Sequence, residues 1–565
     1  MSTVIAGGTR RANAMSANAR VCFTAIAIGI VYLVSAWHTT GPAYLEDEIG
    51  YLANAALFAG HTLDAASSYH AGYSLLITPA FLLGGPHAVW KGVLTINAAL
   101  WAASFAMLQV LLRRLLPDVP PNRLLTATVV TALYPTWIIS SGYALATSAF
   151  VAIYLACLLA LLAWSARSAW SILPHSALTG CLYWVHPTAA AVVVASVIAV
   201  SLEAWRRRDP APLVLHVLVA GLFIAAYQAG VHPAIAAAMT PPGYMPHSHY
   251  PSLASALRTT LTVRGFAEFA TVLFGQCAYF IVASFGLAVV GALYCARRAS
   301  SRTDAANTDT GARSVYALIG AAPPGLMALG AISFFQWPHF EGDFWIYGRY
   351  LDGAMLPVLA IGIAVFKADR KLAALSVFLA AAGLLLQVMT PPHDPPNIVN
   401  TAAFWPQYLA PNAGFLVWML FGAVAVAAVA LVGRRLAIAL LIVAFPLGVY
   451  KQTAWHDWLL TTFSTPSPLA AVVRHDVPRG ACVGVDPKLP DKPTLMQSER
   501  YHLNAFYLFD YAYRRMSPAE WLAQCNGPYL TWDETLVKSG QARQLARDAT
   551  TGLLLLQWTD ASMRR

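Results

Sequence analysis

The feature that most constrains this chain is a series of apolar runs, each close to the length that crosses a lipid bilayer. A helix needs about 20 mostly apolar residues to span the hydrocarbon core, and runs such as 21–37, 92–112 and 414–432 are close to that length. Hydrophobic residues make up 58% of the chain and its mean hydropathy is +0.56. A soluble domain contains about 45–50% apolar residues. The sequence therefore predicts an all-α polytopic membrane protein.

Counting these runs by the same criterion predicts about 13 transmembrane helices. The run 171–204 is too long for one span and is broken at His186-Pro187, so we interpret it as a hairpin of two short helices. The remaining predicted spans are 21–37, 92–112, 124–141, 145–164, 213–229, 270–295, 315–335, 355–366, 372–389, 414–432 and 436–450.

Basic residues define the expected orientation of the helices. They cluster between alternate apolar runs, as in Arg113-Arg114, Arg206–Arg208 and Arg434-Arg435, and cytoplasmic loops carry such an excess of Lys and Arg. We therefore expect a multi-pass protein of the cytoplasmic (plasma) membrane with a cytoplasmic N-terminus. The formal net charge of +10 is explained by these topology signals and does not indicate a nucleic-acid partner.

The last part of the chain has a different composition. We predict a transmembrane domain over 1–450 and a small extracytoplasmic α/β domain over 451–565. Short strands are expected at 481–485, 528–532 and 552–557, and helices at 498–513, 518–524 and 541–547. Cys482 and Cys525 are the only cysteines of this domain, and in an oxidising compartment they are a candidate disulfide pair. Two reduced, buried thiols are the alternative.

Three consecutive carboxylates, Glu46, Asp47 and Glu48, follow the first apolar run. Apolar residues then recur with helical spacing as far as Gly60, so we expect an amphipathic helix at the outer membrane interface. Acidic residues at a helix N-terminus can simply stabilise the helix. Three in a row also repel one another, and this favours a role in chemistry or in binding a cation.

An aromatic turn follows this helix and contains His70 and Tyr73. The apolar segment after it, 74–83, is too short to span a bilayer, so we expect a re-entrant or interfacial helix.

Two motifs resemble those of the GT-C glycosyltransferases. One is Asp47-Glu48-x-x-Tyr51 in the first outer loop, followed by Tyr-x-x-Gly-Tyr73-x-Leu-Leu, and the other is Gly-Arg349-Tyr350-Leu at the start of a late span. The family includes aminoarabinose transferases, protein mannosyltransferases and mycobacterial arabinofuranosyltransferases. The resemblance covers about 40–110 and 345–360 by motif and the rest by topology only, and where the aminoarabinose branch has a Lys-Pro-Pro-like turn this chain has His70-Ala-Gly.

The resemblance implies that the chain is an inverting transferase. It would move one sugar, a pentose such as arabinofuranose or a hexose such as mannose, from a polyprenyl-phosphate donor to a glycan, lipid or protein acceptor of the cell envelope. In that family the first-loop Asp is the catalytic base, and here the matching residue is Asp47.

Other site residues follow from the chemistry of the donor. A guanidinium can fork onto phosphate oxygens, so Arg349 is the first candidate for the donor phosphate, with His70 and Lys91 as alternatives. Tyr51, Tyr73 and Tyr350 are candidates to line the donor site, although an interfacial aromatic belt would also explain them. Whether a divalent cation is needed is left open; Glu46, Glu48 and Asp343 are its candidate ligands or could tune Asp47.

Two other functions compete with sugar transfer. A lipid-linked sugar flippase or transporter usually keeps ionisable residues near the membrane midplane, whereas here they lie at the ends of the predicted spans. A polymerase or ligase using polyprenyl-diphosphate glycans would share the membrane and the outer face but would not need the Asp-Glu-x-x-Tyr motif.

Overall fold

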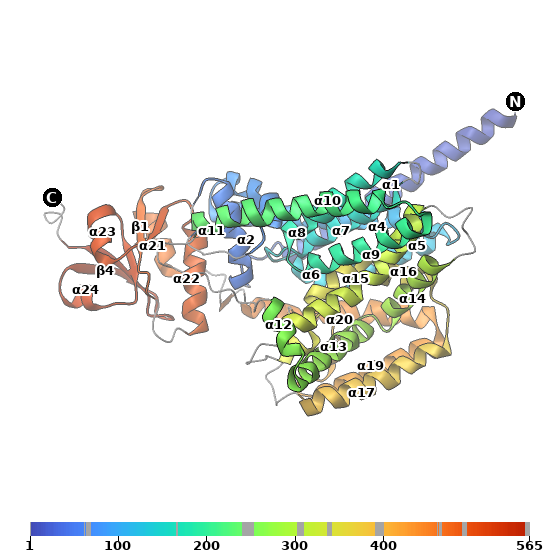
Figure 1. The fold of residues 1–565 in the computed structure, drawn as a ribbon. Helices are drawn as coiled ribbons and strands as arrows, with labels where there is room; N and C mark the ends of the chain where they lie inside the picture. The colour runs from blue at the N-terminus through green and yellow to red at the C-terminus, as the bar shows by residue number, and fades with distance from the viewer. Residues whose placement is uncertain are drawn as a thin grey trace.

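The fold consists of a large helical bundle and a small C-terminal domain built on a β-sheet (Figure 1). A computed structural model of the chain describes residues 2–43, 45–61, 63, 69–164, 168–239, 253–301, 310–335, 342–389, 400–459, 461–462, 466–488 and 494–559.

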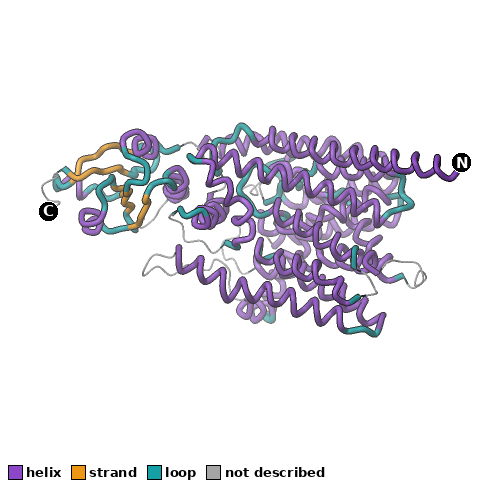
Figure 2. Tube along the Cα trace, turned by 90° about the horizontal axis from the view of Figure 1, so that it is seen from above, coloured by secondary structure: helices purple, strands orange, loops and turns teal. Residues whose placement is uncertain are grey.

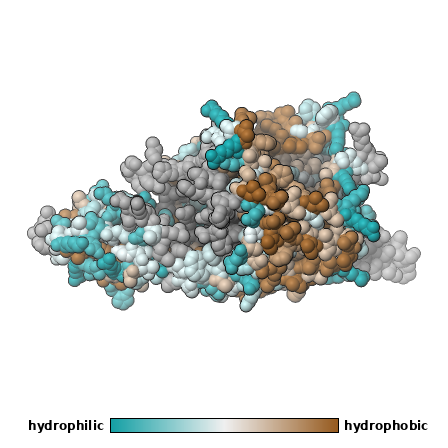
Figure 3. All heavy atoms as spheres, turned by 90° about the horizontal axis from the view of Figure 1, so that it is seen from below, coloured by the Kyte–Doolittle hydropathy of each residue, from teal (hydrophilic) through white to brown (hydrophobic). Residues whose placement is uncertain are grey.

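Ten helical segments in the described part are long and apolar enough to cross a membrane. They are built on α1 (Ser2–Ala36), α4 (Pro86–Leu115), α9 (Ala189–Arg207), α10 (Ala211–Ala226), α13 (Val263–Ala283), α15 (Thr310–Phe334), α16 (Arg349–Val365), α17 (Ala374–Met389), α19 (Phe415–Val432) and α20 (Arg434–Leu459). A π-helical turn joins α10 to α11 (His232–Met239). Figure 3 shows the apolar surface gathered on the bundle, with hydrophilic residues at its edges and on the C-terminal domain. The chain is therefore a multi-pass membrane protein.

The other three predicted spans are shorter helices. The segment 124–141 forms α5 (Pro121–Ala132) and α6 (Pro135–Ser140), which are interrupted before Pro135. The segment 145–164 forms α7 (Thr147–Leu162). The first half of the predicted hairpin forms α8 (Leu173–Val185), and His186 is extended between α8 and α9 as expected. The count of thirteen spans stays a prediction.

The predicted single span 270–295 is wrong, because the chain turns in its middle. The helix α13 ends at Ala283, and three residues separate it from α14 (Leu287–Ser300). Phe285 and Gly286 adopt φ angles of 51° and 79°. Glycine tolerates this left-handed region at little cost, so Gly286 permits the break.

The amphipathic helix after the first span is present as α2 (Leu45–Phe58). Its apolar residues Ile49, Leu52, Ala53 and Ala56 are buried, and Gly60 follows with a φ of 83°. The next segment is α3 (Ala71–Ile77), which continues as a 3-10 helix, η1 (Thr78–Leu83). These short helices lie at the end of the bundle that faces the C-terminal domain (Figure 1).

The C-terminal domain contains a five-stranded mixed sheet of order β2-β1-β3-β5-β4 (Figure 2). Its strands are β1 (Cys482–Val485), β2 (Ala512–Arg515), β3 (Tyr529–Thr531), β4 (Ala542–Arg547) and β5 (Leu554–Trp558). The strand β1 pairs in parallel with β2 and β3, whereas β5 pairs antiparallel with β3 and β4. Four helices accompany them: α21 (Pro468–Asp476), α22 (Leu495–Tyr507), α23 (Pro518–Gln524) and α24 (Thr535–Lys538).

Two helix predictions in this domain are wrong. The segment 541–547 is strand β4, because pairing with β5 provides hydrogen bonds that outweigh the helical preference of its Gln, Ala and Arg residues. The predicted helix 498–513 ends as α22 at Tyr507, and its last residues begin the edge strand β2. The last long bundle helix runs to Leu459, so the domain boundary near 450 stays a prediction.

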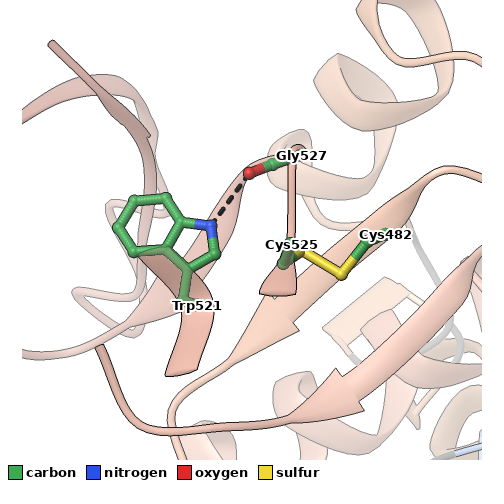
Figure 4. Close-up of a disulfide and its surroundings, with 4 residues drawn as sticks. All are labelled: Cys482, Trp521, Cys525 and Gly527. Carbon is green, nitrogen blue, oxygen red and sulfur yellow. Dashed lines mark hydrogen bonds between the residues drawn. A yellow bond between two sulfur atoms is a disulfide. The ribbon is translucent and has the colours of Figure 1, made fainter. Parts of the chain in front are cut away.

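Cys482 and Cys525 are joined by a disulfide with a Cα–Cα distance of 5.4 Å. Figure 4 shows the bridge linking β1 to the residue that follows α23, next to the hydrogen bond from Trp521 Nε1 to the carbonyl oxygen of Gly527 (2.9 Å). The domain docks on the bundle through α22, which packs against α2. Phe509 contacts the rings of His61 and Phe81 across this junction.

Candidate active site

The acidic triplet at the start of α2 divides into residues with different surroundings. Glu48 is fully buried, and its two oxygens accept hydrogen bonds from the backbone N–H groups of Ala43 (2.7 Å) and Ala144 (2.6 Å). Glu48 therefore ties α2 to the segment after α1 and to the segment before α7. Both of its oxygens have partners within the protein, which favours a structural role over metal binding.

Asp47 is partly buried, with 22% of its side chain accessible. Its Oδ2 accepts a hydrogen bond from Arg349 Nη2, and its Oδ1 accepts one from Tyr69 Oη at 2.5 Å. Burial alone would raise the pKa of Asp47, but the charge of Arg349 and the hydrogen bonds from Tyr69 and Arg349 outweigh it. The pKa therefore lies below its ordinary value, and Asp47 is ionised at neutral pH.

Arg349 connects this pair to a small pocket of about 30 Å³ that is open to solvent. Only 8% of its side chain is exposed. The pocket is lined by Tyr51, Ala146, Thr147, Phe150, His186, Thr188, Arg349, Tyr350 and Gly353. Asp47 is not among these residues, and its ion pair with Arg349 is its link to the pocket lining. A cation at the wall of a small pocket, paired with an ionised carboxylate, can bind an anionic group and hold a base beside it.

The start of α16 is fixed by contacts that place Arg349. The backbone N–H groups of Gly348 and Arg349 donate to the carbonyl oxygen of Asn400, at 2.9 and 3.2 Å. A side chain at position 348 would overlap the ring of Tyr279, so this close approach requires glycine.

Asp352, one turn further along α16, is also fully buried. Its carboxylate accepts hydrogen bonds from Tyr134 Oη (2.7 Å), Thr136 Oγ1 (2.6 Å) and Tyr279 Oη (3.0 Å). These contacts join α16 to α13 and to the break between α5 and α6. In the sequence Asp352 is only a charge at the end of a span, and nothing there identifies its three hydroxyl partners.

The predicted tyrosines all lie close to this site but differ in their contacts. The ring of Tyr51 packs against Tyr69 and Tyr73, at centroid distances of 5.1 and 5.4 Å. Tyr73 is buried and donates to Asn97 Oδ1 at 2.9 Å, so it does not reach the pocket wall. Tyr350 lines the pocket and contacts the ring of His186 at 5.1 Å.

The two alternative phosphate ligands lie outside the pocket lining. His70 Nδ1 contacts the carbonyl oxygen of Tyr183 at 2.5 Å, and its ring packs against Tyr227. Burial lowers the pKa of His70 to about 4, so the ring is neutral at physiological pH. Lys91 donates to the carbonyl oxygens of Trp37 and Thr39 beyond the end of α1.

Two of the three predicted ligands of a divalent cation, Glu46 and Asp343, have side chains outside the described part of the structure. Within the described residues, no group of three or more His, Cys, Asp or Glu side chains is arranged to hold a metal ion.

Sequence reasoning missed His186 and Thr188 as pocket residues. Both lie at the turn between α8 and α9, and His186 Nδ1 is 2.8 Å from Thr188 Oγ1. Burial lowers the pKa of His186 to about 3, so this ring is neutral as well. The break in the long apolar run predicts the turn, but nothing in the sequence indicates that this turn lines the same pocket as Tyr350 and Arg349.

Comparison with solved structures identifies the architecture. Two structures of ArnT from Cupriavidus metallidurans, one in the apo state and one bound to undecaprenyl phosphate, match 96% of this chain and 98% of their own, each with a TM-score of 0.51. The chain has the fold of ArnT. The sequence identities are 14% and 12%, so the likeness concerns the fold alone.

The predicted helical membrane domain with a small C-terminal α/β domain is thus confirmed at the level of the fold. A further match, to the oligosaccharyltransferase AglB from Archaeoglobus fulgidus in complex with an inhibitory peptide and a dolichol-phosphate, has 12% identity and a TM-score of 0.36, over 88% of this chain and 64% of that one. No family model and no curated protein matches this chain by sequence.

Proposed function

We propose that this protein is an inverting glycosyltransferase that uses a polyprenyl-phosphate sugar. The observation that carries the proposal is the ion pair of Asp47 with Arg349 at the wall of a pocket, in a membrane bundle with the ArnT fold. ArnT has been solved with undecaprenyl phosphate bound. A lipid-phosphate donor suits this location because its tail can stay in the bilayer while its head enters a pocket at the end of the bundle.

The proposed reaction needs one base and one phosphate-binding cation. The acceptor hydroxyl oxygen attacks the anomeric carbon of the donor sugar, and its proton passes to Asp47. The bond between the anomeric carbon and the phosphate oxygen breaks, and the electron pair leaves with the polyprenyl phosphate. A glycosyl phosphate already has a good leaving group, so the main demands are an aligned base and stabilisation of the phosphate charge.

Arg349 acts on both groups in this proposal: it keeps the base Asp47 ionised, and it binds the donor phosphate. In the absence of donor its guanidinium holds Asp47 ionised. A donor phosphate in the pocket would compete for the same guanidinium, because a guanidinium binds phosphate and carboxylate through the same fork of N–H groups. Weakening of the Asp47–Arg349 pair would then release the carboxylate for proton transfer, so that the base becomes available when the donor is bound.

We also propose the class of the sugar and of the acceptor. A single pentose such as arabinofuranose, or a hexose such as mannose, would be transferred to a glycan, lipid or protein of the envelope, on the outer face of the plasma membrane. A divalent cation near Glu46 or Asp343 is proposed only as an accessory, since both oxygens of Glu48 are occupied by backbone amides.

The test uses purified full-length protein in lipid nanodiscs with a panel of polyprenyl-phosphate sugars and envelope acceptors. We expect the wild type to release polyprenyl phosphate. The Asp47→Asn variant should have a kcat about 10²–10⁴-fold lower, as is typical when a general base is removed. Glu268→Gln is the matched control, because Glu268 pairs with the exposed Arg264 outside the pocket. Full activity of Asp47→Asn would falsify the role of Asp47.

The same assay separates the rival functions. Movement of an intact lipid-linked sugar across the bilayer without bond cleavage would identify a flippase. Activity only with diphosphate-linked glycans would identify a polymerase or ligase.

A further inference from the structure

A second pocket lies far from the candidate active site. It is open to solvent, has a volume of about 540 Å³ and is lined by Pro120, Asn122, Arg123, Thr126, Ile363, Arg434 and Ile438. Ile363 is 14 residues after Arg349 on the same helix, α16. At 1.5 Å per residue this separation is about 20 Å along the helix axis. The second pocket therefore belongs to the opposite end of the bundle from the Asp47–Arg349 pair and the C-terminal domain.

The charge of this pocket is positive and uncompensated. Its lining contains two arginines, Arg123 and Arg434, and no carboxylate. Within the described part of the chain, neither guanidinium has an ion-pair or hydrogen-bond partner, and Nη1 of Arg434 is buried. A buried guanidinium nitrogen without a partner costs free energy unless a ligand or water satisfies it. Nη1 of Arg434 is thus a hydrogen-bond donor that an acceptor from outside the protein could satisfy.

Two helices also begin at this pocket. The helix α5 starts at Pro121 and its first turn contains Asn122 and Arg123, while α20 starts at Arg434. Pro120 and Pro121 have no N–H group, and the N–H of Arg123 donates to the carbonyl oxygen of Pro120 (2.9 Å), so the start of α5 favours an anion mainly through its helix dipole, as does the start of α20. Two such ends beside two arginines make phosphate or a similar oxyanion the best-matched ligand.

The lining also contains two apolar residues. Ile363 is buried and Ile438 is partly exposed, so part of the pocket lining is apolar. The neighbouring outer surface of the bundle is apolar as well: Leu431 and Val432, at the end of α19 just before Arg434, are 63% and 66% exposed. A free anion would gain nothing from these residues, whereas an acyl chain attached to a phosphate would bury apolar surface on them.

We propose that this pocket binds the phosphate headgroup of an anionic membrane lipid, in the leaflet opposite the candidate active site. Arg123 and Arg434 hold the phosphate oxygens and the helix ends of α5 and α20 add their dipoles. The lipid would fasten α5 and α20 to α16, whose other end carries Arg349.

The test measures binding of phosphatidylglycerol to the full-length protein in neutral detergent, by native mass spectrometry, with phosphatidylcholine as the neutral comparison lipid. We expect one tightly retained phosphatidylglycerol on the wild type. Arg123→Gln and Arg434→Gln should each weaken it about fivefold, the usual contribution of one basic side chain near a lipid headgroup. Arg434→Lys, which keeps the charge without the fork, should fall in between.

Arg435→Gln is the matched control, since Arg435 is adjacent in sequence, exposed and absent from the pocket lining. It should bind phosphatidylglycerol within about twofold of the wild type, because exposed charges are well screened. Equal weakening by Arg435→Gln and Arg434→Gln would refute the pocket in favour of diffuse surface charge. Equal retention of the two lipids by the wild type would refute it too. Displacement of the lipid by millimolar inorganic phosphate would assign the pocket to free phosphate and overturn the lipid proposal. Unfolding temperatures of all variants in neutral lipid should match the wild type, which excludes misfolding as the cause.

Discussion

Replacing Glu48 by Gln separates structure from chemistry within the acidic triplet. Glu48 is fully buried and accepts one backbone N–H at each oxygen, from Ala43 and Ala144. The glutamine amide keeps one acceptor oxygen but turns an NH₂ group, a donor, toward the other N–H. One hydrogen bond is therefore lost and two buried donors face each other.

The magnitude follows from these two contacts. A hydrogen bond to a charged group contributes about 1.5–3 kcal/mol, and a buried donor left without an acceptor costs about 1–3 kcal/mol. We expect Glu48→Gln to lower the free energy of unfolding by about 3 kcal/mol, allowing for partial relaxation. Asp47→Asn should cost less stability, because Asp47 is 22% exposed and the amide still accepts from Tyr69 or Arg349.

The assay is unfolding of both variants and the wild type in mixed micelles, followed by circular dichroism, beside the transferase assay. The variant Glu268→Gln, which breaks a pair with the exposed Arg264, serves as reference and should leave the free energy of unfolding nearly unchanged. The reasoning is refuted if Glu48→Gln is as stable as the wild type but as inactive as Asp47→Asn. That result would make Glu48 a participant in the chemistry.

Three other outcomes are expected. Because the pKa of Asp47 is lowered, its carboxylate should stay ionised from neutral pH to below pH 3.8, the ordinary pKa of an aspartate. Tyr69→Phe removes one hydrogen bond to this carboxylate and should therefore move the acid limb of the kcat profile to higher pH. Burial and the charge of Arg515 lower the pKa of His502 to about 4; the unfolded state then binds a proton below about pH 6.5 while the native state does not. Stability should therefore fall on acidification, by about 2 kcal/mol between pH 7 and pH 5, and thermal melts of His502→Gln should lose this dependence. Reduction of the Cys482–Cys525 disulfide, with a sequence separation of 43, should destabilise the C-terminal domain by up to about 4 kcal/mol, and unfolding with and without reductant measures it.

The sequence predicts the helical bundle well because hydrophobic length is a local property. Apolar runs such as 372–389 and 414–432 coincide with helices, and α2 has the expected amphipathic pattern. The predictions that failed depend on non-local contacts. Pairing with β5 turns 541–547 into a strand, and the left-handed residues 285 and 286 divide an apolar run that looked continuous.

The same distinction applies to the candidate site. Motifs pointed to Asp47 and Arg349 separately, but nothing local shows that residues 302 positions apart form an ion pair. The buried carboxylate of Asp352 was invisible for the same reason: its hydroxyl partners come from other helices. A sequence shows which side chains can do chemistry, whereas their partners depend on how the helices pack.

Geometry along α2 then explains why neighbouring carboxylates have different fates. Successive residues of an α-helix are rotated by about 100°, and residues four apart share a face. Asp47 and Tyr51 therefore lie on one face, and both contact Tyr69, one by a hydrogen bond and one through its ring. Glu48 lies on the next face with Leu52, and both are fully buried. A shift of the triplet by one residue toward the C-terminus would place a carboxylate at position 49, where the fold buries an isoleucine. The position of each carboxylate on the helix, rather than the acidity of the triplet, thus separates the candidate base from the residue that anchors α2.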